Sequence, residues 1–324
     1  MELHLHLEGA IPHEALWELV RKYGGDPSLP DPESLRRRFE YRDFRQFVET
    51  WVWKNQFLRE YEDFTLAAAA MARRLADQNI RYAEVFYSPA DFQVRGLEAQ
   101  GLTVAIRSGL SQASGTQVAL IADLVRDCGP SSAFRTLSEI SEVRDLGVIG
   151  IGMGGSEDKF PPEPFEALYA EARRRGFGTT AHAGEAAGAG SIWGAIRKLK
   201  VDRIGHGTRA EEDESLIEFL VDHQVPLEMC PISNLRTGVI RAYEDHPVRR
   251  FFDRGVIVTI NTDDPAMFGN SLAEEYRLLS ETFRFSRKEI CRLILNGIRA
   301  AWLSSEKREE LAATFCADPA WEPD

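Results

Sequence analysis

The chain has 324 residues, and 39 Lys and Arg against 51 Asp and Glu give a formal net charge of −12. This acidity argues against a nucleic-acid or anionic-membrane partner, because such partners attract clustered basic side chains. The first 20 residues lack a secretory signal, no apolar run is long enough to span a membrane, and the four scattered cysteines form no CxxC pair. We therefore expect a cytoplasmic protein with reduced thiols.

Short β-rich runs and helical stretches alternate along the chain. The opening ELHLH predicts a strand, a helix is predicted at 11–25, and 31–79 has a helical pattern rich in aromatic residues. Seven more β-rich runs, nearly all separated by amphipathic helical stretches, lie at 80–88, 116–124, 147–153, 176–184, 202–207, 225–230 and 255–261. Eight strands alternating with helices predict an α/β fold, a parallel (β/α)8 TIM barrel.

The chain is expected to form one domain over residues 1–324. The 31–79 segment would be a helical, lid-like insertion after the first strand, at the barrel mouth. Helices beyond residue 271 would complete the barrel and add a C-terminal tail.

The first strand carries two histidines within an apolar run. Because side chains alternate between the faces of a strand, His4 and His6 point one way and the leucines around them point the other. In a barrel the leucines would pack beneath the helices and the histidines would face the axis. Two imidazoles are costly to bury without a partner, and a bound cation is one solution. A pair of hydrogen-bonded core histidines is the alternative that this motif alone leaves open.

Titratable residues recur where later strands end. The fifth strand ends in HAGE, with His182 and Glu185; the sixth ends in GHG, with His206; the eighth ends in NTDDP, with Asp263 and Asp264. Catalytic groups of TIM barrels come from such strand ends. Three histidines and an aspartate from strands 1, 5 and 8 could hold one divalent metal. Nitrogen and oxygen ligands favour zinc, with iron, manganese or cobalt as alternatives.

Taken together, the motifs ELHLHLEGA, HAGE, RIGHGT, CPISN and NTDDPAMF resemble those of the adenosine deaminase family of the amidohydrolase superfamily. The resemblance extends over nearly the whole chain, from the first strand to the helix after the eighth. It implies a hydrolase that uses one zinc ion and water to replace the 6-amino group of a purine nucleoside, releasing ammonia. Adenosine or 2′-deoxyadenosine is the expected substrate.

The resemblance also implies roles for individual residues. The implied zinc ligands are His4, His6, His182 and Asp263. Glu185 would protonate purine N1, and His206 would take a proton from the attacking water or orient it. Asp264 would hydrogen-bond N7, and a backbone N–H at Gly155 would meet N3. Asp263 would also act in catalysis, and His6 would also contact the substrate.

Other interpretations of these motifs have less support. GIGMGG at 150–155 fits the dinucleotide fingerprint, but the prolines of SEDKFPPEP block the helix that this fingerprint requires. HLE at 6–8 matches half of the cytidine-type deaminase signature, whose second cysteine is missing from MCPISN. The fourth strand offers no lysine or glutamate to bridge two metals. A catalytically inactive purine-binding barrel would be expected to have lost at least one site residue.

The sequence leaves the 5′ substituent of the substrate open. Adenine deaminases of this family tend to have an aspartate before the catalytic HG, where this chain has Gly205, which favours a nucleoside over the free base. The leading alternative to adenosine is 6-aminodeoxyfutalosine, a menaquinone precursor. Its carboxylate would need a basic partner near the 31–79 segment, for which Lys54, Arg59 and Arg209 are candidates. The sequence carries no signal for the oligomeric state.

Overall fold

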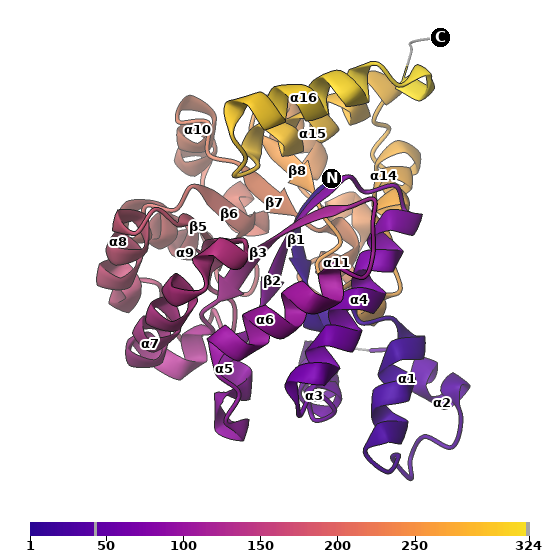
Figure 1. Ribbon diagram of the computed structural model, residues 1–324. Helices are drawn as coiled ribbons and strands as arrows, with labels where there is room; N and C mark the ends of the chain where they lie inside the picture. The colour runs from indigo at the N-terminus through magenta and orange to yellow at the C-terminus, as the bar shows by residue number, and fades with distance from the viewer. Residues whose placement is uncertain (42–43, 322–324) are drawn as a thin grey trace.

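Eight parallel strands follow one another in sequence order around a nearly closed barrel (Figure 1). The structure is a computed structural model that describes residues 1–41 and 44–321. The strands are β1 (Glu2–His6), β2 (Tyr82–Tyr87), β3 (Gln117–Asp123), β4 (Val148–Gly152), β5 (Gly178–Ala183), β6 (Arg203–His206), β7 (Leu227–Met229) and β8 (Val258–Ile260). Each lies within a run that the sequence predicts as a strand, so the predicted (β/α)8 architecture is confirmed.

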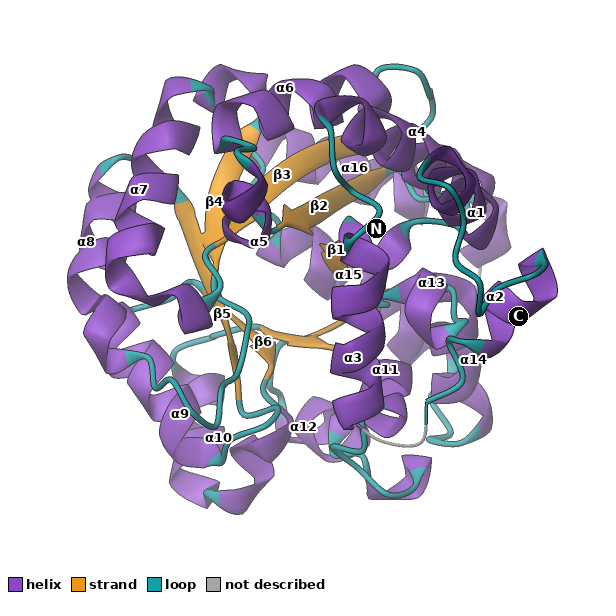
Figure 2. Ribbon diagram, turned by 90° about the horizontal axis from the view of Figure 1, so that it is seen from below, coloured by secondary structure: helices purple, strands orange, loops and turns teal. Residues whose placement is uncertain are grey.

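Helices form a ring around the strands (Figure 2). They are α1 (His13–Lys22), α2 (Pro32–Arg37), α3 (Phe44–Asn55), α4 (Tyr61–Asp77), α5 (Pro89–Phe92), α6 (Ala99–Leu110), α7 (Gly129–Glu142), α8 (Glu166–Arg174), α9 (Ala189–Gly194), α10 (Glu214–Asp222), α11 (Pro231–Arg236), α12 (Val248–Arg254), α13 (Pro265–Phe268), α14 (Leu272–Glu281), α15 (Arg287–Ala300) and α16 (Ser305–Cys316). Within the described residues, no helix combines the length and apolar character needed to cross a membrane.

The barrel has an apolar wall and a filled N-terminal end. Leu5 and Leu7 are fully buried in the core that the strands share with the helices. At the N-terminal end of the barrel, Trp302 lies against Gly150 and Gly178. A β-carbon on these glycines would stand 2.2 Å and 2.4 Å from atoms of the indole. The two glycines therefore make room for the tryptophan that fills the end of the barrel opposite the strand termini carrying the polar motifs.

The barrel closes between β8 and β1 through a small set of hydrogen bonds. The His6 N–H donates to the Asp263 carbonyl (2.9 Å), and the Asp263 N–H donates to the His4 carbonyl (3.1 Å). The side-chain oxygen of Asn261 accepts from the N–H groups of Leu3 (2.7 Å) and His4 (3.2 Å). Closure of the barrel and placement of the candidate site residues therefore depend on the same short segments.

The 31–79 segment contains helices with different positions. The helix α4 packs against α6 on the outer wall, and Gly109 lets the two helices approach closely. A β-carbon there would stand 2.2 Å from the Thr65 carbonyl oxygen. The helix α3 lies instead across the barrel opening (Figure 2). The lid function expected for this segment therefore concerns α3, and it stays a prediction.

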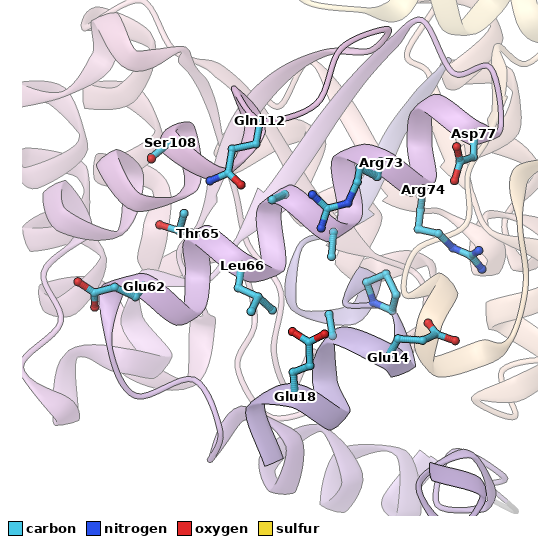
Figure 3. Close-up of a pocket in the computed structure, with 14 residues that line it drawn as sticks. Glu14, Glu18, Glu62, Thr65, Leu66, Arg73, Arg74, Asp77, Ser108 and Gln112 are labelled. Atoms are coloured by element: carbon cyan, nitrogen blue, oxygen red, sulfur yellow. The ribbon is translucent and has the colours of Figure 1, made fainter. Parts of the chain in front are cut away.

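A groove of about 780 Å³ lies on the outer wall between α1, α4 and α6 (Figure 3). Charged residues of both signs line it, among them Glu18, Arg73 and Asp77. Because the groove lies between helices, it is separate from the strand ends that carry the polar motifs.

Candidate active site

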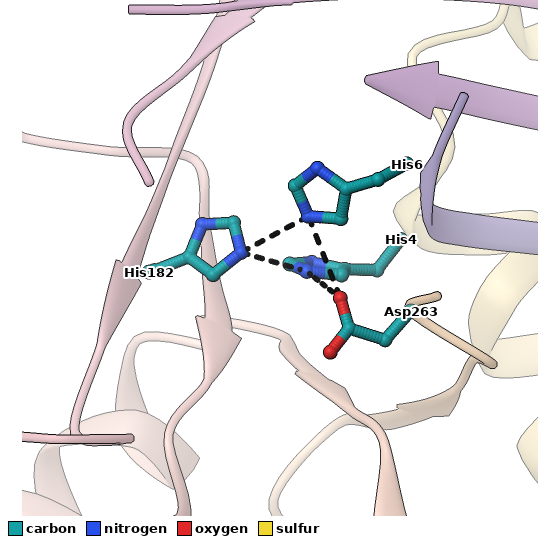
Figure 4. Close-up of side chains that lie close together, drawn as sticks. All are labelled: His4, His6, His182 and Asp263. Atoms are coloured by element: carbon teal, nitrogen blue, oxygen red, sulfur yellow. Dashed lines mark hydrogen bonds and ion pairs between the residues drawn. The ribbon is translucent and has the colours of Figure 1, made fainter. Parts of the chain in front are cut away.

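Three imidazoles and a carboxylate meet at the C-terminal end of the barrel (Figure 4). Nε2 of His182 lies 3.1 Å from Nε2 of His4 and 3.2 Å from Nε2 of His6. Oδ1 of Asp263 lies 3.5 Å from Nε2 of His4 and 3.4 Å from Nε2 of His6. One ligand atom from each residue lies within 4.8 Å of all the others. The structure thus brings together the four residues that the resemblance implies as metal ligands.

The residues with an unusual backbone conformation at this end of the barrel include two of the candidate site residues. His206 ends β6 with a φ of 59°, and Asp263 follows β8 with a φ of 65°. Positive φ angles are uncommon for residues other than glycine and cost on the order of 1–3 kcal/mol each. Such strain concentrates at functional sites. Here it occurs where both side chains face the cluster.

The chemistry of the cluster fits a metal ion. Nδ1 of His4 lies 2.8 Å from Oε2 of Glu228, so Nδ1 carries a proton for this bond and Nε2 faces the cluster. Burial lowers the pKa of His6 to about 3 and that of His182 well below its usual range. Burial also opposes the charged form of His4, but hydrogen bonds to Asp263 and Glu228 raise its pKa to about 10. The carboxylates therefore attract one positive charge, and a divalent cation with imidazole ligands meets the same need.

Glu228 connects His4 to a buried charge network that crosses the barrel. Nε of Arg203 donates to Oε1 of Glu228 (2.5 Å), and Nη2 of Arg203 donates to Oε2 of Glu84 (2.6 Å). The backbone N–H of Trp302 donates to the other oxygen of Glu84 (2.7 Å). Sequence reasoning missed Glu228. Its signal was a glutamate inside the otherwise apolar strand VPLEMC.

Glu185 and His206 lie beside the cluster. Nε2 of His206 is 3.6 Å from Oε2 of Glu185 and 3.9 Å from Oδ2 of Asp263. Burial, together with the carboxylates of Asp263 and Glu157, raises the pKa of Glu185 to about 8. Glu185 therefore keeps its proton at neutral pH, as a general acid must.

The loop that carries Glu185 is held by a carboxylate that sequence reasoning missed. Glu157 accepts hydrogen bonds from the backbone N–H groups of residues 184–187 at 2.6–3.1 Å. Four donors on one buried carboxylate fix the backbone after β5, because each N–H would otherwise lack a partner. No recognised motif marks Glu157, which lies in the loop after β4.

Asp264 faces the cavity next to the cluster. Its Oδ1 is buried and makes no hydrogen bond within the described residues. Gly9 provides the space, because a β-carbon on Gly9 would stand 1.7 Å from this oxygen. Burial, with the Asp263 carboxylate, raises the pKa of Asp264 well above its usual range, so a protonated Asp264 can donate a hydrogen bond. Gly155 lies in the wall of the same cavity with a φ of +96°.

The cluster opens into a cavity of about 460 Å³, within the range that holds drug-sized ligands. Val48 and Val52 of α3 line it although their side chains are largely exposed. Arg95 lines it as well. The Arg95 guanidinium donates to the carbonyls of Asn55 (2.8 Å) and Leu58 (3.1 Å), and within the described residues it forms no ion pair.

The basic residues suggested from the sequence lie outside this cavity wall. Lys54 is buried with Nζ 3.8 Å from the centre of the Trp51 ring. Arg59 stacks on a tyrosine, and Arg209 pairs with a surface glutamate. All three make local contacts, and the expectation that one of them faces the substrate stays a prediction; Arg95, which the sequence did not single out, lines the cavity.

Known proteins resemble this chain over nearly its whole length. The sequence model of the family described as adenosine deaminase matches residues 1–317. An adenine deaminase of Chlorobium phaeobacteroides (strain BS1) is 35% identical over 318 residues, which cover 97% of this chain and 94% of that protein. An aminodeoxyfutalosine deaminase of Streptomyces avermitilis is 34% identical over 318 residues, covering 96% and 88%.

Solved structures agree with this relationship. The crystal structure of adenine deaminase from Arthrobacter aurescens has a TM-score of 0.90 at 32% identity and covers 97% of each chain. An amidohydrolase from Burkholderia ambifaria with bound Zn has a TM-score of 0.90 at 26% identity, covering 99% of this chain and 90% of that one.

Fold and site together define a barrel hydrolase of the amidohydrolase type, with a histidine and aspartate cluster that could hold a metal. The chain belongs to the adenosine deaminase family, and it is a deaminase.

Proposed function

We propose that the protein hydrolytically deaminates a 6-aminopurine whose N9 substituent ends in an apolar segment and a carboxylate, as in 6-aminodeoxyfutalosine. The observation that carries this proposal is the part of the cavity wall formed by the apolar side chains of Val48 and Val52 and by Arg95, whose guanidinium donates to two carbonyls but has no carboxylate partner within the described residues. A free base would leave this part of the cavity unused. The Streptomyces relative is named for this substrate.

Zinc is the metal we propose, because the donor set is three imidazoles and one carboxylate, and the Burkholderia barrel holds Zn. A metal held by His4, His6, His182 and Asp263 would supply an activated water as the nucleophile at neutral pH.

The remaining site residues have complementary tasks in this proposal. The protonated Glu185 carboxyl donates to purine N1, which makes C6 more electrophilic. The protonated Asp264 carboxyl donates to N7, which is an acceptor. The backbone N–H of Gly155 donates to N3. His206 orients the oxygen that attacks C6 or takes a proton from it, and this role is supported by the position of its Nε2 between Glu185 and Asp263.

Free adenine is the second candidate, because the Chlorobium relative and the Arthrobacter structure are both named adenine deaminase. One contact counts against it. This chain has Gly205 where adenine deaminases of the family tend to have an aspartate before the catalytic HG, and the space at Gly205 is taken by His4, whose Cε1 would lie 2.9 Å from a β-carbon there. Adenosine, the substrate first expected, has less support than either, since neither curated relative is named for it.

An ultraviolet absorbance assay of the zinc-loaded protein tests the proposal. The substrates are 6-aminodeoxyfutalosine, adenine, adenosine, 2′-deoxyadenosine and AMP. We expect the highest kcat/KM for 6-aminodeoxyfutalosine. A higher kcat/KM for adenine would replace the proposal with the second candidate, and a higher value for adenosine would restore the first expectation.

The role of Arg95 is tested by Arg95→Gln, with Arg59→Gln as the control. A hydrogen bond to a charged group contributes about 1.5–3 kcal/mol, so KM for the carboxylate-bearing substrate should rise about ten- to a hundredfold. Turnover of adenosine by the same variant separates binding from packing, because Arg95 also holds the end of α3 through two carbonyls. Equal losses for both substrates would contradict recognition of the carboxylate.

A further inference from the structure

Two buried residues behind His206 form a hydrogen-bonded chain that the reaction described above does not use. Nδ2 of Asn234 lies 3.1 Å from Nδ1 of His206, and Oδ1 of Asn234 lies 3.1 Å from Nε2 of His246. Asn234 is fully buried and His246 nearly so. Neither residue belongs to the cavity wall.

The direction of this chain follows from a backbone group. Imidazole tautomers and the orientation of amide side chains must be inferred from their partners. The N–H of Val248 can only donate, and it donates to Nδ1 of His246 (3.2 Å). Burial lowers the pKa of His246 to about 3, so the ring holds one proton, which is on Nε2. Nε2–H then requires an acceptor, and the facing atom of Asn234 is therefore its oxygen.

The orientation of the Asn234 amide determines which nitrogen of His206 carries a proton. With its oxygen towards His246, Asn234 directs its NH2 group at Nδ1 of His206. Thr208 Oγ1 also donates to the Asn234 oxygen (3.0 Å), in agreement with this orientation. Nδ1 of His206 is thus an acceptor, and the proton of the neutral ring is on Nε2. That nitrogen is buried, has no hydrogen-bond partner within the described residues and faces Glu185.

We propose that Asn234 and His246 are positioning residues that hold His206 as an Nε2–H donor, so that His206 orients the attacking oxygen and does not take a proton from it. The backbone N–H of Val248 fixes the tautomer of His246, and His246 fixes the orientation of the Asn234 amide. Asn234 in turn fixes the tautomer of His206. In this arrangement no proton arrives at or leaves His206. The proton that the attacking oxygen gives up passes to the Asp263 carboxylate, whose Oδ2 lies 3.9 Å from Nε2 of His206, and from there to the departing amine. Of the two roles that the resemblance allows for His206, the geometry selects orientation.

Nitrogen NMR of the ring tests the tautomer without any substrate. The sample is zinc-loaded protein with ¹⁵N-labelled histidine, and the His206 signals are identified by their loss in His206→Gln. Long-range proton–nitrogen correlations distinguish a protonated ring nitrogen from an unprotonated one. We expect a protonated Nε2 and an unprotonated Nδ1. A proton on Nδ1, alone or together with one on Nε2, would overturn the proposal.

The kinetic test is Asn234→Asp, and it rests on the proposed deaminase reaction. A carboxylate cannot donate to Nδ1, so in the neutral ring the His206 proton moves to Nδ1 and Nε2 becomes an acceptor; the nitrogen spectrum of the variant verifies that Nε2 has lost its proton. Loss of a donor aimed at the reacting oxygen should lower kcat about 10²- to 10³-fold with little change in KM. An unchanged or higher kcat would mean that His206 acts as a base, which overturns the proposal. If the whole substrate panel is inactive, the tautomer measured by NMR still decides.

Two further variants separate positioning from folding. Asn296→Asp makes the same exchange at a partly buried asparagine of α15 that donates to the Val258 carbonyl (3.2 Å) and is not part of the cavity wall, and it should retain kcat and metal content. His246→Phe removes the donor that orients Asn234, so kcat should fall and both His206 tautomers should appear in the spectrum. A single Nε2–H tautomer with unchanged kcat in His246→Phe would remove His246 from the proposal. His246→Phe also supplies the kinetic answer if Asn234→Asp fails to fold.

Discussion

At the scale of single residues, the site depends on carboxyl groups that keep their protons. Burial and the neighbouring Asp263 carboxylate raise the pKa of both Glu185 and Asp264. A purine nitrogen such as N1 or N7 is an acceptor, so a carboxyl group can bind it only in the protonated form. The environment therefore selects the protonation state that the proposed reaction requires.

The pH dependence of activity follows from Glu185. Its pKa is raised to about 8, so the protonated form is present below that pH and is lost as the pH rises through it. We expect kcat/KM to fall on the alkaline side of about pH 8. Glu185→Gln should lower kcat by about 10²- to 10⁴-fold and remove this alkaline limb, whereas Glu166→Gln, on exposed α8, should change neither. If the alkaline limb persists in Glu185→Gln, the ionisation that causes it belongs to another group.

Sequence reasoning identified the residues that meet at the strand ends better than the residues that hold them in place. His4, His182 and Asp263 stand in short motifs at strand ends, and the fold brings them together. Glu157 and Asn234 were missed as supporting residues because each acts through a partner at least 27 positions away in the chain. Only the folded backbone makes such pairs neighbours.

At the scale of elements, one aspartate joins α1 to the start of α4. Asp63 accepts from Lys22 Nζ and the Tyr23 hydroxyl of the first helix, both at 2.5 Å. It also accepts from the N–H groups of Arg59 (2.8 Å) and of Glu60 (2.9 Å), the N-cap residue of α4. The same carboxylate therefore caps one helix and fixes the other against it.

We expect Asp63→Asn to lower the free energy of unfolding by about 1–3 kcal/mol, because the amide cannot accept all four bonds. Burial would raise the pKa of Asp63, but its hydrogen bonds with Lys22 and Tyr23 outweigh burial and lower it. The contribution is therefore complete above the unfolded value of about 3.9 and is lost as the pH falls through the lower folded value. Denaturant unfolding at neutral and acid pH measures it, with exposed Glu62→Gln as the control. A difference from wild type that is the same at both pH values would contradict an ionic role.

Helical patterning could not assign places to the helices between β1 and β2. The aromatic stretch of the 31–79 segment forms two helices separated by residues 56–60; α4 belongs to the outer wall and α3 lies across the opening. Periodicity shows which face of a helix is apolar. A helix of the outer wall and a helix over the opening both bury an apolar face, so the pattern does not distinguish them. Trp51 and Trp53 show the difference within one helix: Trp51 lines the cavity, and Trp53 donates to Asp26 away from it.

At the scale of the whole molecule, the barrel closes at a seam between β8 and β1, and the cluster of histidines and Asp263 lies across this seam. The strand order was predictable because each parallel strand is followed by a connection to its neighbour. The seam was not, because β8 meets β1 through side chains and single bridges such as Leu5 with Asp263. The cluster takes His4 and His6 from β1 and Asp263 from the end of β8.

An ion held by this cluster ties the two edges of the seam together and binds only the folded chain. Ligand binding stabilises the native state by about 4 kcal/mol when the free ligand is a thousandfold above its Kd. We therefore expect dialysis against a chelator to lower the Tm by several degrees and re-addition of zinc to restore it. His182→Ala removes one ligand but leaves the seam hydrogen bonds intact, so its Tm should respond little to the chelator. Elemental analysis follows the metal in each sample, and complete loss of metal with an unchanged Tm would mean that hydrogen bonds alone close the barrel.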